Sequence, residues 1–571
     1  MPEKMFTQEI STERRIVIEN TCEACRLDKG TSRLSLLDEL NSLEQTFIKK
    51  EHGVYKTVHD KLFDFLSYYF GKQMIQCLIK NADSNLIMER FLFERENDMD
   101  SFTTIVQPKY HKSYIQRLVE DWSIGKVMHV FANNNMEQSK FRQKLLIYLN
   151  TLDVSHQKQL ADTRFVSSKD TVLLQCCFRG DIPFTQWCCD QGVDVNLCRF
   201  DGTSPLFAAS EEGHTQVVKI LLDNKADVNK CKFDRTSPLF GACLYNNADI
   251  VKLLLENKAN VDQARNSDSL TSLCVACIEG YIDIVKMLIC YQANINECNS
   301  CGYTPLLLAC IYNHVGIIKL LIENKADINE CSNTETSPLC VACQNNNIDI
   351  VKILLDNKAD INMCDNGGES PLLAACERGY FDIVELLLRN EVDINKCLDG
   401  LQSALHIACQ YSHVDIVKLL LDNNADINKC PDNGESPIFV ACQKNNLYIV
   451  KLLLNKNADI NKSRPDTGES PLFVACRYNH VDIVKVLLEN KADINKSRSS
   501  ITPIFAGCHE GHTEIVKILL EKGADINICA SEDGLNFITP MQIAIKKDHT
   551  DIVNLFREYL NMQSLVLEES R

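Results

Sequence analysis

The sequence lacks any long, uncharged apolar run. No stretch reaches the roughly 18 to 20 apolar residues that a membrane-spanning helix needs, so we expect no transmembrane helix and no membrane insertion. The first twenty residues, MPEKMFTQEISTERRIVIEN, also have no apolar core of the kind that a secretory signal needs. We therefore expect a cytoplasmic protein.

Positive charge and catalytic motifs are also scarce. Lys and Arg number 60 against 77 Asp and Glu, which gives a net charge of −17 and disfavours non-specific binding to nucleic acid or to an anionic membrane. The phosphate-binding pattern GxxxxGK[ST] is absent, and no motif places a nucleophile beside a base. We expect no enzyme activity, no nucleic-acid partner, no cofactor and no small-molecule substrate.

Cysteine, in contrast, is abundant and periodic, with 28 residues in the chain. One series recurs at steps of 32 to 34 residues: Cys243, Cys277, Cys310, Cys343, Cys376, Cys409, Cys442, Cys476 and Cys508. A second recurs at 33 residues, with one step of 67 where a copy lacks it: Cys198, Cys231, Cys298, Cys331, Cys364, Cys397 and Cys430. Such spacing marks positions in a repeat, and a reduced compartment explains why so many thiols are tolerated. The isolated pair Cys22 and Cys25 has no second pair to complete a zinc site, so no metal is expected.

A Ser/Thr-Pro-apolar step anchors each repeat. Its proline is Pro205, Pro238, Pro305, Pro338, Pro371, Pro437, Pro471, Pro503 and Pro540. Ser272 and Ala404 fill the same place in two further copies, and a degenerate copy at 171–196 comes first, which makes about twelve units.

One unit, SPLCVACQNNNIDIVKILLDNKADINMCDNGGE at 337–369, shows the local structure that the repeat predicts. Ser337 is a natural N-cap, and Pro338 suits the first helical position. NNN interrupts this first helix, a second helix presents Ile350 and Leu354 on one face, and DNGG is a turn. Each unit is therefore expected to be a helix, a short turn, a second helix and a hairpin-like loop.

This pattern resembles the ankyrin repeat, whose period and T-P-L-H-x-A signature it follows. The resemblance covers roughly residues 170–560 and implies a mostly α-helical solenoid of about twelve helix-turn-helix repeats. The signature histidine is present only as His406, while other copies have Phe, Leu or Cys. Those substitutions exchange a side-chain hydrogen bond for apolar packing.

Two polar residue types recur with the same period. Histidines fall at the turn between the two helices, where we interpret them as makers of a repeated turn hydrogen bond: His214, His314, His413, His480 and His512. Lysines lie in the second helix opposite its leucines, where we interpret them as a solvated outer face: Lys219, Lys252, Lys286, Lys319, Lys352, Lys418, Lys451, Lys485 and Lys517.

The end of the first helix predicts a binding surface. Counted from the anchoring proline, positions +6 and +7 point away from the apolar positions +1, +4 and +5, and in ankyrin-like proteins this is the concave binding face. Position +7 holds four tyrosines, a residue that interface hot spots favour: Tyr245, Tyr312, Tyr411 and Tyr478. Glu369, Glu435 and Glu469 at the loop tips favour a basic or polar protein partner. The alternative is that these tyrosines only cap the helix and cover a neighbouring seam.

The segment before the repeats has a different pattern. Residues 31–70 read as a helix, a two-stranded wing with a turn at His52 and Gly53, and a second helix, which is a winged-helix arrangement. The pattern His59, Leu62, Asp64, Phe65 resembles the winged helix of NACHT-type (STAND) signalling NTPases. The resemblance implies that His59 contacts a nucleotide phosphate, a role that is vestigial without the phosphate-binding loop.

We expect five parts: a disordered or partly ordered N-terminus (1–30), a winged-helix-like segment (31–70), a helical connector (71–168), ankyrin repeats (169–560) and a C-terminal tail (561–571). The expected function is a scaffold or sensor that binds a protein partner on the concave face, in intracellular signalling or innate immunity. Two alternatives remain: a substrate adaptor for a ubiquitin ligase, and a fragment of a NACHT/STAND NTP-dependent switch.

Overall fold

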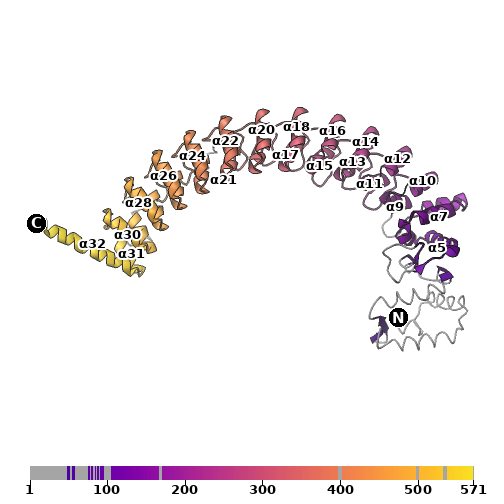
Figure 1. The fold of residues 1–571 in the computed structure, drawn as a ribbon, viewed down its shortest axis with the longest axis horizontal. Helices are drawn as coiled ribbons and strands as arrows, with labels where there is room; N and C mark the ends of the chain where they lie inside the picture. The colour runs from indigo at the N-terminus through magenta and orange to yellow at the C-terminus, as the bar shows by residue number, and fades with distance from the viewer. Residues whose placement is uncertain are drawn as a thin grey trace. The chain divides into compact units, whose positions relative to one another are not determined.

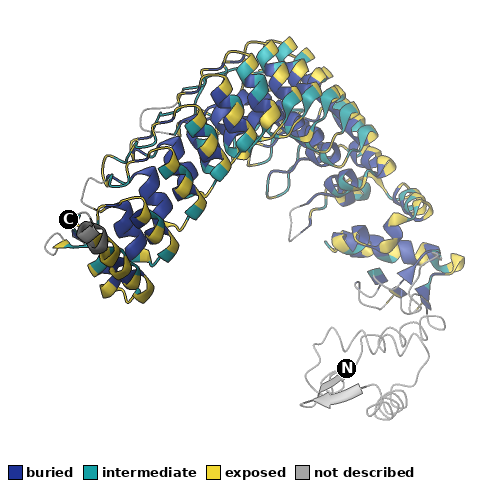
Figure 2. Cartoon of the chain, turned by 60° about the vertical axis from the view of Figure 1, so that its left-hand side comes forward, coloured by how far each residue is buried: buried dark blue, intermediate teal, exposed yellow. Residues whose placement is uncertain are grey.

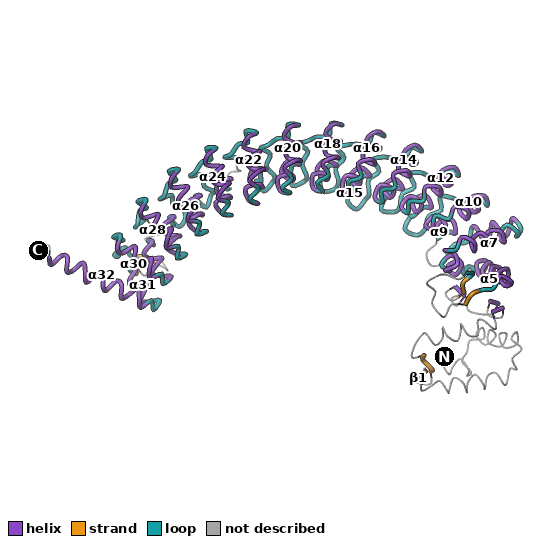
Figure 3. The backbone as a smooth tube through the Cα atoms, viewed as in Figure 1, coloured by secondary structure: helices purple, strands orange, loops and turns teal. Residues whose placement is uncertain are grey.

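The computed structural model describes residues 48–51, 54–57, 75–76, 79–80, 84, 87–88, 91–94, 104–165, 170–396, 402–496, 501–531 and 537–569. The chain forms two compact units, Met1–Ser267 and Asp268–Arg571. Figure 1 labels helices of both units in chain order. Helices dominate the described parts of both units, and short loops join them (Figure 3). The predicted fold class, a mostly α-helical repeat solenoid, is confirmed.

The two-stranded wing expected around His52 and Gly53 is present as an antiparallel pair. Strand β1 (Ile48–Glu51) pairs with β2 (Val54–Thr57), and Glu51 lies opposite Val54 at the turn. His59, Leu62, Asp64 and Phe65 lie outside the described residues, as do Cys22 and Cys25. The winged-helix segment as a whole therefore remains a prediction.

Between residues 104 and 165, which the structure describes without a gap, the predicted connector contains four α-helices packed on an aromatic core. They are α5 (His111–Ser123), α6 (Val127–Phe131), α7 (Ser139–Leu149) and α8 (Val154–Ala161), preceded by a parallel pair of two-residue strands, β3 (Phe91–Leu92) and β4 (Thr104–Ile105). The Trp122 ring packs edge-on against Phe131 and Trp187, and its indole Nε1 donates to the Leu160 carbonyl oxygen at 3.0 Å. Since Trp187 belongs to the first helix pair of the repeats, this core joins the connector to the repeats within the first unit.

Twelve helix pairs follow in the described residues, three in the first unit and nine in the second, as the sequence predicts. The first unit holds α9 (Val172–Arg179), α10 (Ile182–Asp190), α11 (Pro205–Glu211), α12 (Thr215–Asp223), α13 (Pro238–Leu244) and α14 (Ala248–Glu256). The second unit begins with α15 (Ser272–Glu279), α16 (Ile282–Cys290), α17 (Pro305–Ile311), α18 (Val315–Glu323), α19 (Pro338–Gln344), α20 (Ile348–Asp356), α21 (Pro371–Arg378), α22 (Phe381–Arg389), α23 (Ala404–Gln410) and α24 (Val414–Asp422). It ends with α25 (Pro437–Gln443), α26 (Leu447–Asn455), α27 (Pro471–Arg477), α28 (Val481–Glu489), α29 (Pro503–Glu510), α30 (Thr513–Glu521), α31 (Pro540–Lys546) and α32 (Thr550–Glu569).

The last repeat contains the longest spacing between anchors, from Pro503 to Pro540. The extra residues include an antiparallel pair of short strands, β5 (Ala530–Ser531) and β6 (Phe537–Ile538). The insertion therefore extends the loop between α30 and α31.

Capping and turn residues explain the bounds of each helix pair. The Ser337 hydroxyl accepts a hydrogen bond from the Cys340 backbone N–H at 3.2 Å, and Pro338 occupies the first turn of α19, as predicted. The chain then turns through the left-handed region, with φ of 56° at Asn346 and 77° at the equivalent Gly379. Asn and Gly tolerate that conformation best, which is why NNN and RGY both serve as turns.

The first helix of each pair lies inside the stack and the second lies outside. All six residues from Pro338 to Cys343 in α19 are buried, whereas in α20 only Ile350, Val351 and Leu354 are buried. Figure 2 shows the same contrast along the stack, with exposed residues on the outer side of the second helices. The short first helix is thus held by neighbours on both sides, and only its C-terminal end reaches solvent.

An asparagine ladder links successive hairpin loops within each unit. In nine repeats, the Asn that ends a DIN, DVN or NIN segment accepts a hydrogen bond through Oδ1 from a backbone N–H in the following repeat. In the first unit the acceptors are Asn196 and Asn229, at 2.7 Å each. In the second unit they are Asn296, Asn329, Asn362, Asn395, Asn428, Asn461 and Asn495, at 2.8 to 2.9 Å. These bonds from side chain to backbone align each of these hairpin loops with the loop of the following repeat.

Candidate protein-binding face

The four predicted tyrosines lie at the exposed ends of buried helices. Each is the C-cap residue of a first helix, where the chain leaves the core. The exposed fraction is 56% for Tyr245 in the first unit, and 51%, 47% and 47% for Tyr312, Tyr411 and Tyr478 in the second. The predicted direction of position +7 is therefore correct, while binding by these residues remains a prediction.

Contacts with the neighbouring turn orient two of these rings. Tyr411 lies nearly parallel to His413 with ring centroids 6.2 Å apart, and Tyr478 lies on His480 at 6.1 Å. The Tyr411 hydroxyl also donates to Glu377 Oε1 of the preceding repeat at 3.0 Å, a bond that raises the pKa of Tyr411. The rings are thus held in place while about half of each remains open to solvent, which limits the entropy that binding would cost.

The turn histidines hold adjacent repeats together. His314 Nε2 lies 2.8 Å from the Ile278 carbonyl oxygen, and His413 Nε2 lies 3.1 Å from that of Glu377. Because a carbonyl can only accept, Nε2 must carry the proton. Equivalent contacts join His214, His480, His512 and His549 to the preceding repeat. The interpretation as a repeated turn hydrogen bond is confirmed, but the partner lies in the previous repeat rather than in the same turn.

The three predicted glutamates pair with arginines of the same surface. Glu369 accepts from Gln344 Nε2 at 2.6 Å and lies 3.3 Å from Arg378 Nη1. The Arg464 guanidinium lies between Glu435 at 3.2 Å and Glu469 at 3.8 Å. These carboxylates are consequently less available to a basic partner than the sequence indicates.

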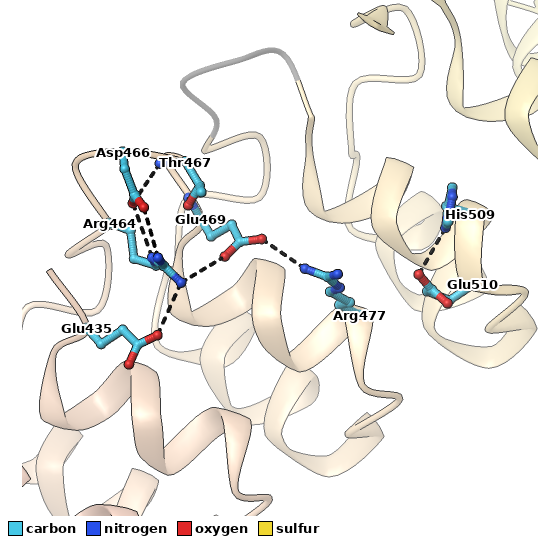
Figure 4. Close-up of polar contacts among 8 residues, drawn as sticks. All are labelled: Glu435, Arg464, Asp466, Thr467, Glu469, Arg477, His509 and Glu510. Atoms are coloured by element: carbon cyan, nitrogen blue, oxygen red, sulfur yellow. Dashed lines mark hydrogen bonds and ion pairs between the residues drawn. The ribbon is translucent and has the colours of Figure 1, made fainter. Parts of the chain in front are cut away.

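Figure 4 shows how Arg464 organises this cluster. Arg464 also binds Asp466 at 2.9 Å, and the pKa of Asp466 is lowered chiefly by that contact. Arg477 Nη1 reaches Glu469 at 3.1 Å, so one carboxylate joins two arginines. The cluster therefore fixes a mixed, hydrogen-bonding surface beside Tyr478.

The signature histidine, His406, is fully buried in α23. Neither ring nitrogen has a hydrogen-bond partner of normal geometry, so the side-chain bond that the resemblance implies for this position is not made. Burial lowers the pKa of His406 to about 4, and the main chain of Glu435 offsets part of that shift. His406 is thus a neutral core residue rather than part of the exposed face.

The periodic lysines have the structural role that we expected, and the periodic cysteines of the first helices are core residues. The nine cysteines of the first helices are buried, and burial raises the pKa of thiols such as Cys310 and Cys376. All nine periodic lysines of the second helices are exposed; Lys286 and Lys485 approach acidic residues on the same outer side at 3.2 and 3.3 Å. These two series therefore add nothing to the tyrosine face.

Within the described residues, no group of three or more His, Cys, Asp or Glu side chains is arranged to hold a metal ion. No helix in the part of the chain that the structure describes is both long and apolar enough to cross a membrane.

Comparisons with known proteins point to one family. Residues 128–232, 227–297, 273–365, 339–431 and 427–498 match a family model described as "Ankyrin repeats (3 copies)", and residues 504–557 match "Ankyrin repeats (many copies)". The first match begins at residue 128, inside the predicted connector. No curated protein matches the chain. Among solved structures, the chain is similar to the human ASB11 ankyrin repeat domain, with 27% identity over 39% of this chain and 98% of that one, and a TM-score of 0.35.

Proposed function

The chain belongs to the ankyrin-repeat family, and from that premise we propose that it binds a protein partner through the exposed ends of its first helices. Repeats of this family are generally protein–protein interaction modules and are typically not enzymes. The proposed contact residues are Tyr245, Tyr312, Tyr411 and Tyr478. The observation that carries the proposal is the exposure of these tyrosines, between 47% and 56%, on helices that are otherwise buried.

Tyrosine at these positions combines contact area with a polar tip. A ring that is already oriented loses little rotational freedom on binding, which is why tyrosine is common at hot spots. Tyr411 and Tyr478 flank Lys444, which is exposed at the equivalent position of the repeat between them. This stretch therefore offers two aromatic anchors and one cation.

The glutamates Glu369, Glu435 and Glu469 remain part of the proposed surface, with a changed role. We expect them to hold Arg378, Arg464 and Arg477 in place, so that a partner meets ordered guanidinium and carboxylate groups together. Such a mixed rim suits a polar partner surface better than a strongly basic one.

The cellular setting that we propose is intracellular signalling or innate immunity, in the cytoplasm. The support for this setting is the winged-helix resemblance around His59. Of that winged-helix segment, the structure describes only the β1–β2 pair.

The proposal can be tested by affinity capture with the full chain as bait. The test variant is Tyr411→Ala/Tyr478→Ala. The matched control is Tyr448→Ala, because Tyr448 is 62% exposed but lies on the second helix α26. A partner of this face should be retained by wild type and control and lost from the double variant. Retention by all three baits would exclude Tyr411 and Tyr478 as contact residues.

A further inference from the structure

Two phenylalanines are exposed at neighbouring hairpin tips of the first unit. The exposed fraction is 58% for Phe200 and 75% for Phe233, which are equivalent residues of successive repeats. The Phe233 backbone N–H donates to the Asp201 carbonyl oxygen at 3.1 Å, so the two tips lie side by side. Neither ring belongs to the tyrosine face or to the aromatic core.

The fold itself does not require an aromatic residue at this position. The equivalent hairpin residues of the second unit are small or polar: Ser300, Asn333, Asn366, Asp432 and Asp466. Three of those hairpins form the same main-chain bond, in which the N–H of Ser300, Asn333 and Asn366 donates to a carbonyl oxygen of the preceding hairpin at 2.9, 3.0 and 3.1 Å. Exposed apolar side chains grouped on a soluble surface commonly mark an interaction site.

Cations lie close to the two phenylalanines in the sequence. Residues 199–203 and 230–236 contain four cations but only two carboxylates, Asp201 and Asp234, in a chain whose net charge is −17. The Arg199 guanidinium lies 5.2 Å from the Phe200 ring centroid, a cation–π distance. Arg199 also pairs with Asp170 at 3.4 Å and with Asp201 at 3.6 Å, so this cation is fixed beside the ring. Lys232 Nζ lies 5.0 Å from the centroid of the Phe207 ring.

A hairpin of the second unit provides an internal comparison. At 330–336 the chain has Glu330, Asn333 and Glu335 where the 230–236 hairpin has Lys230, Phe233 and Arg235. The backbone is the same, since φ is 63° at Arg235 and 61° at Glu335. The hairpin fold thus accepts a positively or a negatively charged side chain at these positions. The aromatic and the cationic residues occur together at the hairpin tips of the first unit.

We infer that Phe200 and Phe233, with Arg199, Lys230, Lys232 and Arg235, form a second binding site, whose ligand is a protein segment that carries a large apolar side chain beside carboxylates. The apolar side chain packs on the two rings, and the carboxylates meet the cations. Nucleic acid fits less well, because Asp201 and Asp234 lie within the patch and the chain as a whole repels a polyanion. The site is separate from the proposed tyrosine face.

The test uses a random-peptide phage library panned on the intact chain, followed by fluorescence anisotropy with the enriched peptides. The aromatic variant is Phe200→Ser/Phe233→Ser, because serine occupies the equivalent position at Ser300. The charge variant is Lys230→Glu/Arg235→Glu, because the chain itself has glutamate at the equivalent positions Glu330 and Glu335. The control is Phe537→Ser, since Phe537 is 67% exposed on β6 and lies outside the patch.

We expect enriched peptides that combine Asp or Glu with a large apolar residue. Their affinity should fall at least tenfold in both double variants and remain unchanged in the control, with melting curves alike for all four proteins. The inference is overturned if no peptide is enriched, if enriched peptides lack acidic residues, or if the charge variant binds them equally well. Tighter binding of a fluorescein-labelled 20-nucleotide oligo-dT than of any peptide would assign the patch to nucleic acid instead.

Discussion

Replacing His406 by Phe should remove a large part of the acid sensitivity of the second unit. His406 is fully buried, and burial lowers its pKa from 6.5 to about 4. The folded state therefore resists protonation in the range where the unfolded chain accepts a proton. The contribution of neutral His406 to the free energy of unfolding is therefore fully present above pH 6.5 and is lost as the pH falls from 6.5 toward 4.

The magnitude follows from these two pKa values. Between pH 7 and pH 5, proton uptake by the unfolded chain should cost the wild type about 2 kcal/mol at this residue. Phe is a natural replacement, because Phe439 and Phe473 occupy the same position in the next two repeats and are buried there. Removing a buried ring whose nitrogens lack partners should also stabilise the protein at pH 7, by about 1 kcal/mol or more.

The assay is urea denaturation of wild type and His406→Phe at pH 7 and pH 5. Taking the difference between the two proteins cancels the titration of the other shared groups. We expect the free energy of unfolding to fall by about 2 kcal/mol more in the wild type than in the variant. An equal loss in both proteins would show that His406 is not held neutral by burial, and would refute the reasoning.

Three further outcomes are expected. Leu354→Ala should lower the free energy of unfolding by roughly 2–5 kcal/mol because it leaves a core cavity, whereas Tyr411→Ala should change it by under about 0.5 kcal/mol. An equal fall in melting temperature for both variants would show that Tyr411 is a seam residue. Asn362→Ala should cost about 1 kcal/mol by removing one ladder bond of 2.9 Å, and unchanged urea midpoints would show that the ladder is dispensable. Iodoacetamide should label exposed Cys290 well before buried Cys343, whose pKa is raised by burial, and equal rates in mass spectrometry would contradict the stacked core.

Local rules were enough to predict the repeat. Ser337, Pro338 and the NNN turn each have one strongly preferred backbone role, so their order along the chain predicts a helix, a turn and a second helix. The direction of Tyr411 followed from the same helical geometry. Features determined within about ten residues of chain were therefore predictable.

Contacts between repeats were not predictable in the same way. The sequence marks His413 as a turn residue, but its partner is the carbonyl of Glu377, 36 residues earlier. Glu435 looked like a free loop-tip acid because Arg464, its partner, is 29 residues away in the next hairpin. Periodicity could have indicated such pairs, since a contact between successive repeats recurs at about one period.

The exposed phenylalanines were missed for a different reason. Phe200 and Phe233 precede the Ser/Thr-Pro step, in a hairpin whose sequence varies from repeat to repeat. A comparison of that position along the chain would have singled them out, because only these two of the described hairpin tips carry an aromatic residue there.

Site-specific photo-crosslinking in cells can show whether the ends of the first helices contact a protein partner. A photoreactive phenylalanine analogue would replace Tyr411, Tyr478 or, as the matched control, Tyr448 on the outer helix. We predict that the same partner is crosslinked from positions 411 and 478 and not from 448. A partner crosslinked from 448 but from neither of the other two would place binding on the outer face and contradict the proposed function.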